Sequence, residues 1–139
     1  MSERAPNDTE ATRAVITGFY SEVSSSSESI FDKYIDPEIV FEAPGWLPIG
    51  GVHHGIDVFV NTIMPGAAAL VDTSSVRVES VVVDGDIAVV FLRSKLIDTG
   101  EEILVIEDFR VRDGKVTFLR LSHHDARPLM ALLARADST

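Results

Sequence analysis

Hydrophobic residues in the first third of the chain recur at helical spacing. This spacing predicts a helix from about Thr9 to Val23, which ends at the serines of residues 24–27 because serine side chains compete for backbone hydrogen bonds. A second, shorter helix is predicted over residues 28–34, since Pro37 disfavours helical geometry in the residue before it. The apolar stripe of the first helix consists of Ala11, Val15, Phe19 and Val23.

The middle of the chain mixes extended and helical signals. Residues 39–42 read as a short strand, and residues 43–51 hold two prolines and three glycines, which indicates an ordered loop. A third helix is predicted to begin after Gly55 and to break or kink at Pro65 and Gly66.

The second half alternates apolar and polar residues, which is typical of strands. The turn dipeptides Asp84-Gly85, Thr99-Gly100 and Asp113-Gly114 join these segments into a four-stranded antiparallel meander. Residues 128–135 then predict a C-terminal helix. The four strands are expected at Ser75–Val83, Ile87–Ile97, Glu101–Arg112 and Lys115–His123.

This order of elements predicts an α+β fold. We expect a curved antiparallel sheet, with the three N-terminal helices packed over its concave face and a short helix at the C-terminus. Residues 1–8 are expected to form a flexible tail, and residues 9–139 a single domain. A hollow between the concave face and the helices is a common site for a small ligand.

Composition narrows the possible functions. The net charge is −10, and the twelve basic residues are dispersed, so neither nucleic acid nor an anionic membrane is an expected partner. The chain has no cysteine, which excludes disulfides and thiolate chemistry. No apolar run is long enough to span a membrane, and the polar start is unlike a signal peptide, so a cytoplasmic protein is expected. No cofactor is expected, since no dinucleotide or phosphate-loop motif is present.

Several short motifs carry a resemblance to a known family. They are Phe41-Glu42-Ala43-Pro44, the segment 51–55 that leads into a helix, and the run 107–116 followed by a last strand that ends near Asp125. In this order the chain resembles the nuclear transport factor two-like, or cystatin-like cone, superfamily. Within it the chain is most similar to SnoaL-like polyketide cyclases and ketosteroid-isomerase-like proteins. The resemblance covers roughly residues 9–125.

The positions that are catalytic in this superfamily are mostly altered here. The resemblance places the general-base aspartate of ketosteroid isomerases at Ala43 and their oxyanion tyrosine near Phe19, beside Tyr20. It places the catalytic aspartate of SnoaL-type cyclases at Leu121. The Arg-x-Asp of limonene-epoxide-hydrolase-like proteins reads Arg93-Ser94-Lys95, without the acid. The isomerases' protonated aspartate corresponds to Glu107, which keeps its acidic type.

Two residues emerge as candidate catalytic groups. Glu107 falls on the apolar face of its strand, where burial would raise the pKa of its carboxyl group, and this favours a role as acid, base or hydrogen-bond donor. His123 shares the inner face of the last strand, where it would form a carboxylate–imidazole pair with Glu107. The alternatives are a rim carboxylate paired with an arginine, and a core histidine bound to a backbone carbonyl.

Five further residues are candidates for contacting a substrate. Tyr20 and Trp46 are large rings with polar tips, suited to a flat hydrophobic ligand, although both could serve the core instead. His53 or His54 is expected at the mouth of the hollow, with His54 the chosen candidate, and Phe109 is expected inside it. Arg93 would bind an acidic group if its face is the inner one, as its apolar companions on that face indicate; otherwise it lies on an outer face buried in a dimer.

A metal site is not expected. The pairs His53-His54 and His123-His124 are adjacent in sequence, and adjacent strand residues point to opposite faces. No histidine spacing typical of a zinc site is present. Asp125 is instead interpreted as a cap of the last helix.

The leading hypothesis is a small cofactor-independent enzyme. It would bind a hydrophobic oxygenated ring compound, such as a polyketide, terpenoid or steroid, and catalyse isomerisation, cyclisation or epoxide opening. The altered positions leave open a non-catalytic binding module and a dimerisation module. The resemblance also implies a homodimer formed through the outer sheet face.

Overall fold

The computed structural model describes residues 6–23 and 28–137 of the chain. Helix α1 (Pro6–Glu22) begins within the segment predicted to be a tail, because proline suits the first turn of a helix, and α2 (Glu28–Tyr34) lies where a second helix was predicted. The first five residues of that tail and the serines at 24–27 lie outside the described residues.

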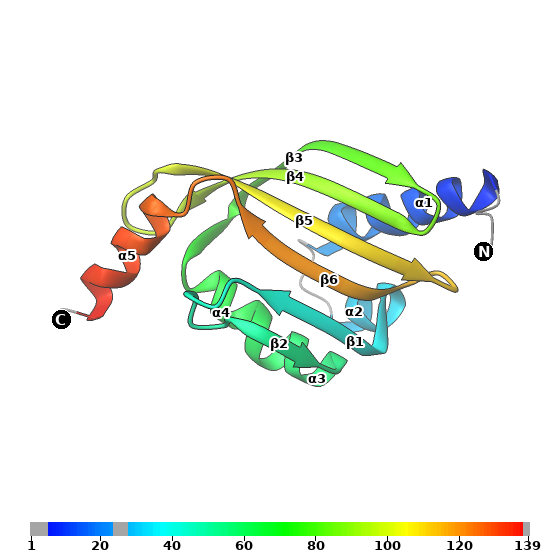
Figure 1. Cartoon of the computed structure of the whole chain (residues 1–139), viewed down its shortest axis with the longest axis horizontal. Helices are drawn as coiled ribbons and strands as arrows, with labels where there is room; N and C mark the ends of the chain where they lie inside the picture. Colours follow the sequence, from blue (N-terminus) through cyan, green and yellow to red (C-terminus); the bar gives the residue numbers. More distant parts are fainter. Residues whose placement is uncertain (1–5, 24–27, 138–139) are drawn as a thin grey trace.

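Six strands form one sheet in the order β2-β1-β6-β5-β4-β3 (Figure 1). The last four strands along the chain form the antiparallel meander that the turn dipeptides predict. The sheet is not wholly antiparallel, since β1 pairs in parallel with β6. The strands are β1 (Ile35–Ala43), β2 (Gly51–His54), β3 (Val71–Asp84), β4 (Ile87–Leu96), β5 (Glu102–Arg112) and β6 (Lys115–His123).

The third predicted helix is a composite of three segments. It consists of α3 (Ile56–Val58), a π-helical turn η2 (Phe59–Ile63) and α4 (Met64–Ala68). Of the break or kink predicted at Pro65, the break does not occur, because the proline lies in the first turn of α4, where its missing N–H is tolerated.

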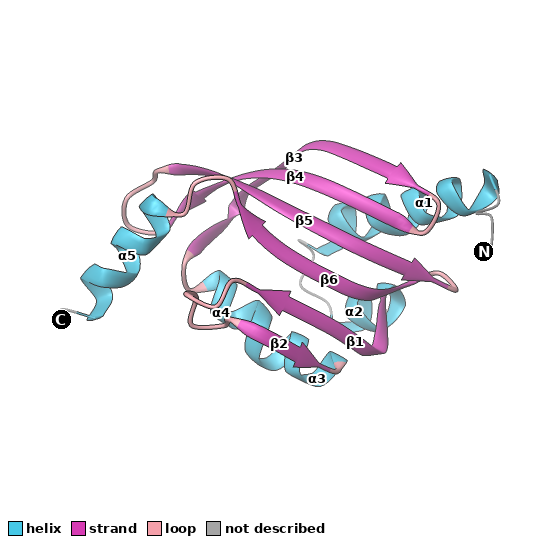
Figure 2. Cartoon of the chain, viewed as in Figure 1, coloured by secondary structure: helices cyan, strands magenta, loops and turns pink. Residues whose placement is uncertain are grey.

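Helices α1 to α4 all lie on one face of the curved sheet, and α5 (Arg127–Asp137) projects from one end (Figure 2). We call the helix-covered face of the sheet the inner face and the opposite one the outer face. Residues directly opposite one another in the ladder share a face. The inner face therefore contains the rows Ala88–Phe109–Leu119, Val90–Glu107–Leu121 and Leu92–Val105–His123.

The inner face supplies much of the hydrophobic core. Phe109, Val90 and Ala88 are fully buried. Ile16 of α1 and Phe59 of the third helix, which pack in the same core, are at most 2% exposed. The two acid–base candidates Glu107 and His123 interrupt this apolar surface and are only half-buried.

Candidate functional site

Helix α1 is fixed at both ends, and this sets the position of the tyrosine near its C-terminus. At the start of the helix, the hydroxyl of Thr9 accepts a hydrogen bond from the backbone N–H of Gly85, in the β3–β4 turn. Near its end, the Tyr34 hydroxyl donates a hydrogen bond to Glu22. A Cβ added at Gly18 would lie 2.6 Å from the Tyr34 hydroxyl, so glycine permits this close approach.

Tyr20 and Glu107 form the central contact of the site. The Tyr20 hydroxyl on α1 donates a hydrogen bond to Oε1 of Glu107 on β5. The Tyr20 ring is held edge-on by Phe19 and Phe109, with ring centroids 5.4 Å and 6.1 Å away. Such edge-to-face contacts restrict the orientation of the ring, so the hydroxyl is aimed at the carboxyl group.

The surroundings alter the acidity of both groups. Burial raises the pKa of the Glu107 carboxyl, and the hydrogen bond from Tyr20 offsets part of that rise. Burial, and then the nearby carboxylate, raise the pKa of the Tyr20 hydroxyl, so it remains a proton donor in the hydrogen bond. Glu107 therefore keeps its proton to a higher pH than an exposed glutamate, as a general acid or hydrogen-bond donor requires.

His123 lies on the inner face as predicted, but not as the partner of Glu107. It stands opposite Val105, while Leu121 stands opposite Glu107, so the two candidates are diagonal neighbours in the sheet. The predicted carboxylate–imidazole pair is thus replaced by the Tyr20–Glu107 pair. The imidazole of His123 instead contacts the ring of Trp46, with centroids 5.4 Å apart.

The His123 imidazole is poor in hydrogen bonds. Within the described part of the chain, its Nδ1 is buried and has no hydrogen-bond partner, whereas Nε2 does not share that burial. Burial lowers the pKa of this imidazole, which favours the neutral ring.

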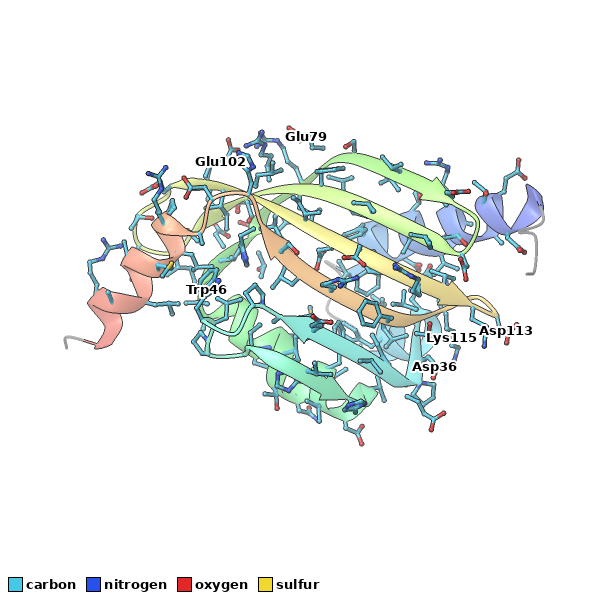
Figure 3. All side chains as sticks on the ribbon, viewed as in Figure 1. Asp36, Trp46, Glu79, Glu102, Asp113 and Lys115 are labelled. Atoms are coloured by element: carbon cyan, nitrogen blue, oxygen red, sulfur yellow. The ribbon has the colours of Figure 1, made fainter. Side chains whose placement is uncertain are left out.

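Trp46 is presented by a structured loop between β1 and β2. Leu47 and Ile49 of this loop are buried in the core, and Trp46 itself is 36% exposed. Trp46 is labelled in Figure 3. Backbone hydrogen bonds of 3.1 Å and 2.8 Å close two successive turns of the loop, at Pro44–Leu47 and Leu47–Gly50. The loop anchors its own tryptophan, which agrees with the ordered loop that the prolines and glycines indicate.

Two of the predicted substrate contacts, Arg93 and His54, lie on the outer face, and a third, Phe109, lies on the inner face but without open space beside it. Arg93 is on the outer face, where its guanidinium bonds to Glu79 at 3.1 Å. His54 is on the outer side of β2 and exposed, opposite Val40. Phe109 does face inward, but it is completely buried and contacts Tyr20 rather than open space.

Of the adjacent histidines His53 and His54, it is His53 that lies on the inner side of β2. It stands opposite Phe41, and a hydrogen bond of 2.9 Å joins its Nε2 to the carbonyl oxygen of Ile49. Sequence reasoning did not single out this role, although the alternation of β1 would have assigned His53 to the face of Phe41. Asp125 caps α5 as predicted, accepting a hydrogen bond from the Arg127 backbone N–H at 3.1 Å.

Two cavities of the described chain lie away from Glu107. One, of about 450 Å³, lies between α4 and the strands β3 and β4, and includes Ala68, Val71 and Leu96 in its lining. The other, of about 270 Å³, lies beside the first turns of α1 and the β5–β6 turn.

No cluster of three metal-ligating side chains occurs among residues 6–23 and 28–137. Over the same residues, no helix has both the length and the apolar character needed to cross a bilayer.

Comparison with known proteins places these features in context. Residues 16–119 match the SnoaL-like domain. No curated protein matches the chain.

Three solved structures illustrate the likeness of the fold. An NTF2-like protein from Burkholderia xenovorans is 19% identical with a TM-score of 0.68, covering 92% of this chain and 96% of its own. TerC, co-crystallised with polyporic acid, is 18% identical with a TM-score of 0.72, covering 89% and 98%. A protein from Sinorhizobium meliloti, provisionally named a polyketide cyclase, is 18% identical with a TM-score of 0.63, covering 78% and 93%.

Proposed function

We propose that this chain, which belongs to the SnoaL-like domain family, binds a hydrophobic oxygenated ring compound against the inner face of the sheet. It would act on that compound by acid–base chemistry. The observation that carries this proposal is the Tyr20–Glu107 hydrogen bond on an otherwise apolar face. Two of the similar structures support this ligand class, one by its provisional name as a polyketide cyclase and one by its co-crystallisation with polyporic acid.

The role of each group follows from its surroundings. Protonated Glu107 donates its proton, or a hydrogen bond, to a carbonyl or epoxide oxygen of the ligand. Tyr20 supports that function by holding the carboxyl group through Oε1, which leaves Oε2 for the ligand. Glu107, Leu121 and His123 all lie on the inner face and yet remain half-buried, so ligand atoms have some surface to contact.

The first test is ligand binding by the wild-type protein and Glu107→Gln. A panel of steroids, aromatic polyketides, lactones and terpene epoxides is screened by thermal shift. A ligand at a hundredfold excess over its Kd stabilises the folded protein by ~2.7 kcal/mol. We expect one ligand class to raise the melting temperature of the wild type and its shift to change in Glu107→Gln.

The matched control is Glu101→Gln. It removes the same charge from an exposed position near the start of β5, and the ligand shift should stay as in the wild type. Turnover of the bound class is then followed by mass spectrometry. Full turnover by a folded Glu107→Gln protein would refute the catalytic role of Glu107.

A second candidate function is ligand binding without chemistry. Two family positions for catalytic aspartates hold Ala43, which is 6% exposed, and Leu121, which faces Glu107 across the strands. Neither can move a proton, so the chain lacks a second acidic group there. In this case a bound ligand would be recovered unchanged by mass spectrometry after prolonged incubation with the wild-type protein.

We also propose a homodimer formed through the outer sheet face. Helices α1 to α4 leave this face uncovered (Figure 2), and Val52 and Val82 on it are each 57% exposed. At its centre, Ile106 stands beside Phe91 in the ladder. Ile106→Glu should convert a dimer to a monomer in sedimentation equilibrium, whereas the exposed control Met130→Glu should not. A monomeric wild type would refute this proposal.

A further inference from the structure

His123 differs from the other inner-face residues because it brings a polar ring to an apolar surface without a hydrogen bond. Its neighbours in the ladder are Val105 and, one strand further, Leu92. Neither side chain can accept or donate a hydrogen bond. In the described part of the chain, the only ring in contact with it is that of Trp46, whose face or edge likewise offers no oxygen.

The burial of one ring nitrogen fixes the position of the proton on the neutral imidazole. Nδ1 is buried and has no partner among the described residues. An orphaned buried N–H is rarer in proteins than an orphaned acceptor. We therefore assign the proton of the neutral ring to Nε2, and burial lowers the pKa of the imidazole, which favours the neutral form. The imidazole thus presents a single N–H donor.

A second donor lies nearby on the same face. Diagonal neighbours on an antiparallel pair have Cα atoms roughly 7–8 Å apart, which is the relation between His123 and Glu107. Burial raises the pKa of Glu107 and so favours its protonated form, which would donate through Oε2 because Oε1 already accepts from Tyr20. The inner face thus carries two polar side chains on neighbouring strands, at diagonal positions of an otherwise apolar surface.

We propose that His123 binds an acceptor oxygen of the ligand through Nε2–H, so that the site selects ring compounds with two carbonyl-type oxygens, one at Glu107 and one at His123. This inference rests on the proposed function and specifies its ligand class. The Trp46 ring packs beside His123 and offers an apolar surface for the ligand ring between the two oxygens. His123 is accordingly a binding residue that stays neutral, and it does not relay a proton from Glu107.

The proton position is tested first, without any ligand. Nitrogen chemical shifts of the His123 ring, assigned by comparison with His123→Phe, should show the Nε2–H form at neutral pH. A proton on Nδ1, or an imidazolium ring, would overturn the inference.

The ligand preference is tested with two probes of similar shape. Menadione carries two carbonyl oxygens on its ring system and α-tetralone carries one. Menadione reacts with thiols, but the chain has no cysteine. Equilibrium dialysis should show that the wild type binds menadione more tightly than α-tetralone.

Two variants isolate the hydrogen bond from the packing. His123→Phe keeps a ring against Trp46 and removes the N–H; it should weaken menadione binding about tenfold and leave α-tetralone binding within a factor of about two. His123→Gln places an amide N–H near the position of Nε2 and should recover most of the loss.

The outcomes separate the two proposals. Binding of both probes with an unchanged affinity ratio in His123→Phe would overturn the role of His123 and leave the proposed function standing. Failure of the wild type to bind either probe would overturn this inference. Failure to bind any member of the screening panel as well would also refute the proposed function.

Discussion

The hydrogen bond between Tyr20 and Glu107 makes a quantitative prediction for Tyr20→Phe. The variant removes one hydroxyl and keeps the ring that packs against Phe19 and Phe109. A hydrogen bond to a charged group contributes ~1.5–3 kcal/mol and one between neutral groups ~0.5–1.5 kcal/mol. Tyr20 therefore favours the ionised form of Glu107 by about 1–1.5 kcal/mol. Its loss should raise the already elevated pKa of Glu107 by roughly one further unit.

The assay is a pH titration of the side-chain carboxyl carbons by nuclear magnetic resonance. The Glu107 signal is identified by its absence in Glu107→Gln. The matched control is Tyr34→Phe, which removes another tyrosine hydroxyl from a glutamate, in that case Glu22. This control should leave the Glu107 titration unchanged, and Tyr20→Phe should also lose about 1 kcal/mol in its free energy of unfolding.

Two results would refute this reasoning. The first is a Glu107 pKa that stays the same or falls in Tyr20→Phe, since the hydrogen bond would then not favour the ionised form. The second is an equal rise in Tyr34→Phe, which would indicate a general effect on the helix pair α1–α2 rather than on the bond itself.

Three further variants test other parts of the site. Because the folded-state pKa of Glu107 lies above its ordinary value of 4.5, ionisation destabilises the folded protein as pH rises through that pKa; the unfolding free energy of Glu107→Gln should therefore rise relative to the wild type in urea titrations at increasing pH. Protonation of His123 should quench the fluorescence of Trp46 with a midpoint below 6.5, and His123→Phe should abolish that transition. Gly66→Ala places a Cβ about 2.5 Å from Cγ2 of the buried Ile49, so we expect a net loss of about 1–2 kcal/mol in unfolding free energy by chemical denaturation.

Each of these has a control within the chain. Glu101→Gln removes an exposed carboxylate near the start of the same strand and is the charge-matched control for Glu107→Gln. Gly45→Ala should be close to neutral, since an added Cβ there meets nothing within 4 Å. A fluorescence transition that persists in His123→Phe, or equal destabilisation by the two glycine variants, would contradict the corresponding prediction.

The strands of the meander could be predicted because their turns have strong sequence signals. Gly85, Gly100 and Gly114 all adopt the positive φ angles that these turns require. The strand Gly51–His54 was missed, because it has only four residues and three of them are exposed, so no alternation marks it. A break of the helix at Pro65 does not occur because a proline is compatible with a first helical turn, and the sequence does not show that a π-helical turn precedes it.

The candidate site was predicted only as far as local alternation could reach. Alternation on β5 and β6 correctly assigned Glu107 and His123 to the inner face. It could not indicate that Tyr20, from a distant helix, is the partner of Glu107, because that contact depends on how α1 crosses the sheet. Alternation did not give the correct face for Arg93. Its apolar companion Phe91 indicated the inner face, but both residues lie on the outer face, which is itself partly apolar.

The separation of the two central groups along the chain has a consequence for how the protein folds. Tyr20 and Glu107 are 87 residues apart, and β1 pairs with β6 near the other end of the chain. Such distant pairings close large loops and are slow to form, so the meander of neighbouring strands should assemble before them. The chain would thus acquire its acid–base pair only in the last steps of folding. A refolding experiment that follows hydrogen exchange should find the meander amides protected earlier than those of β1.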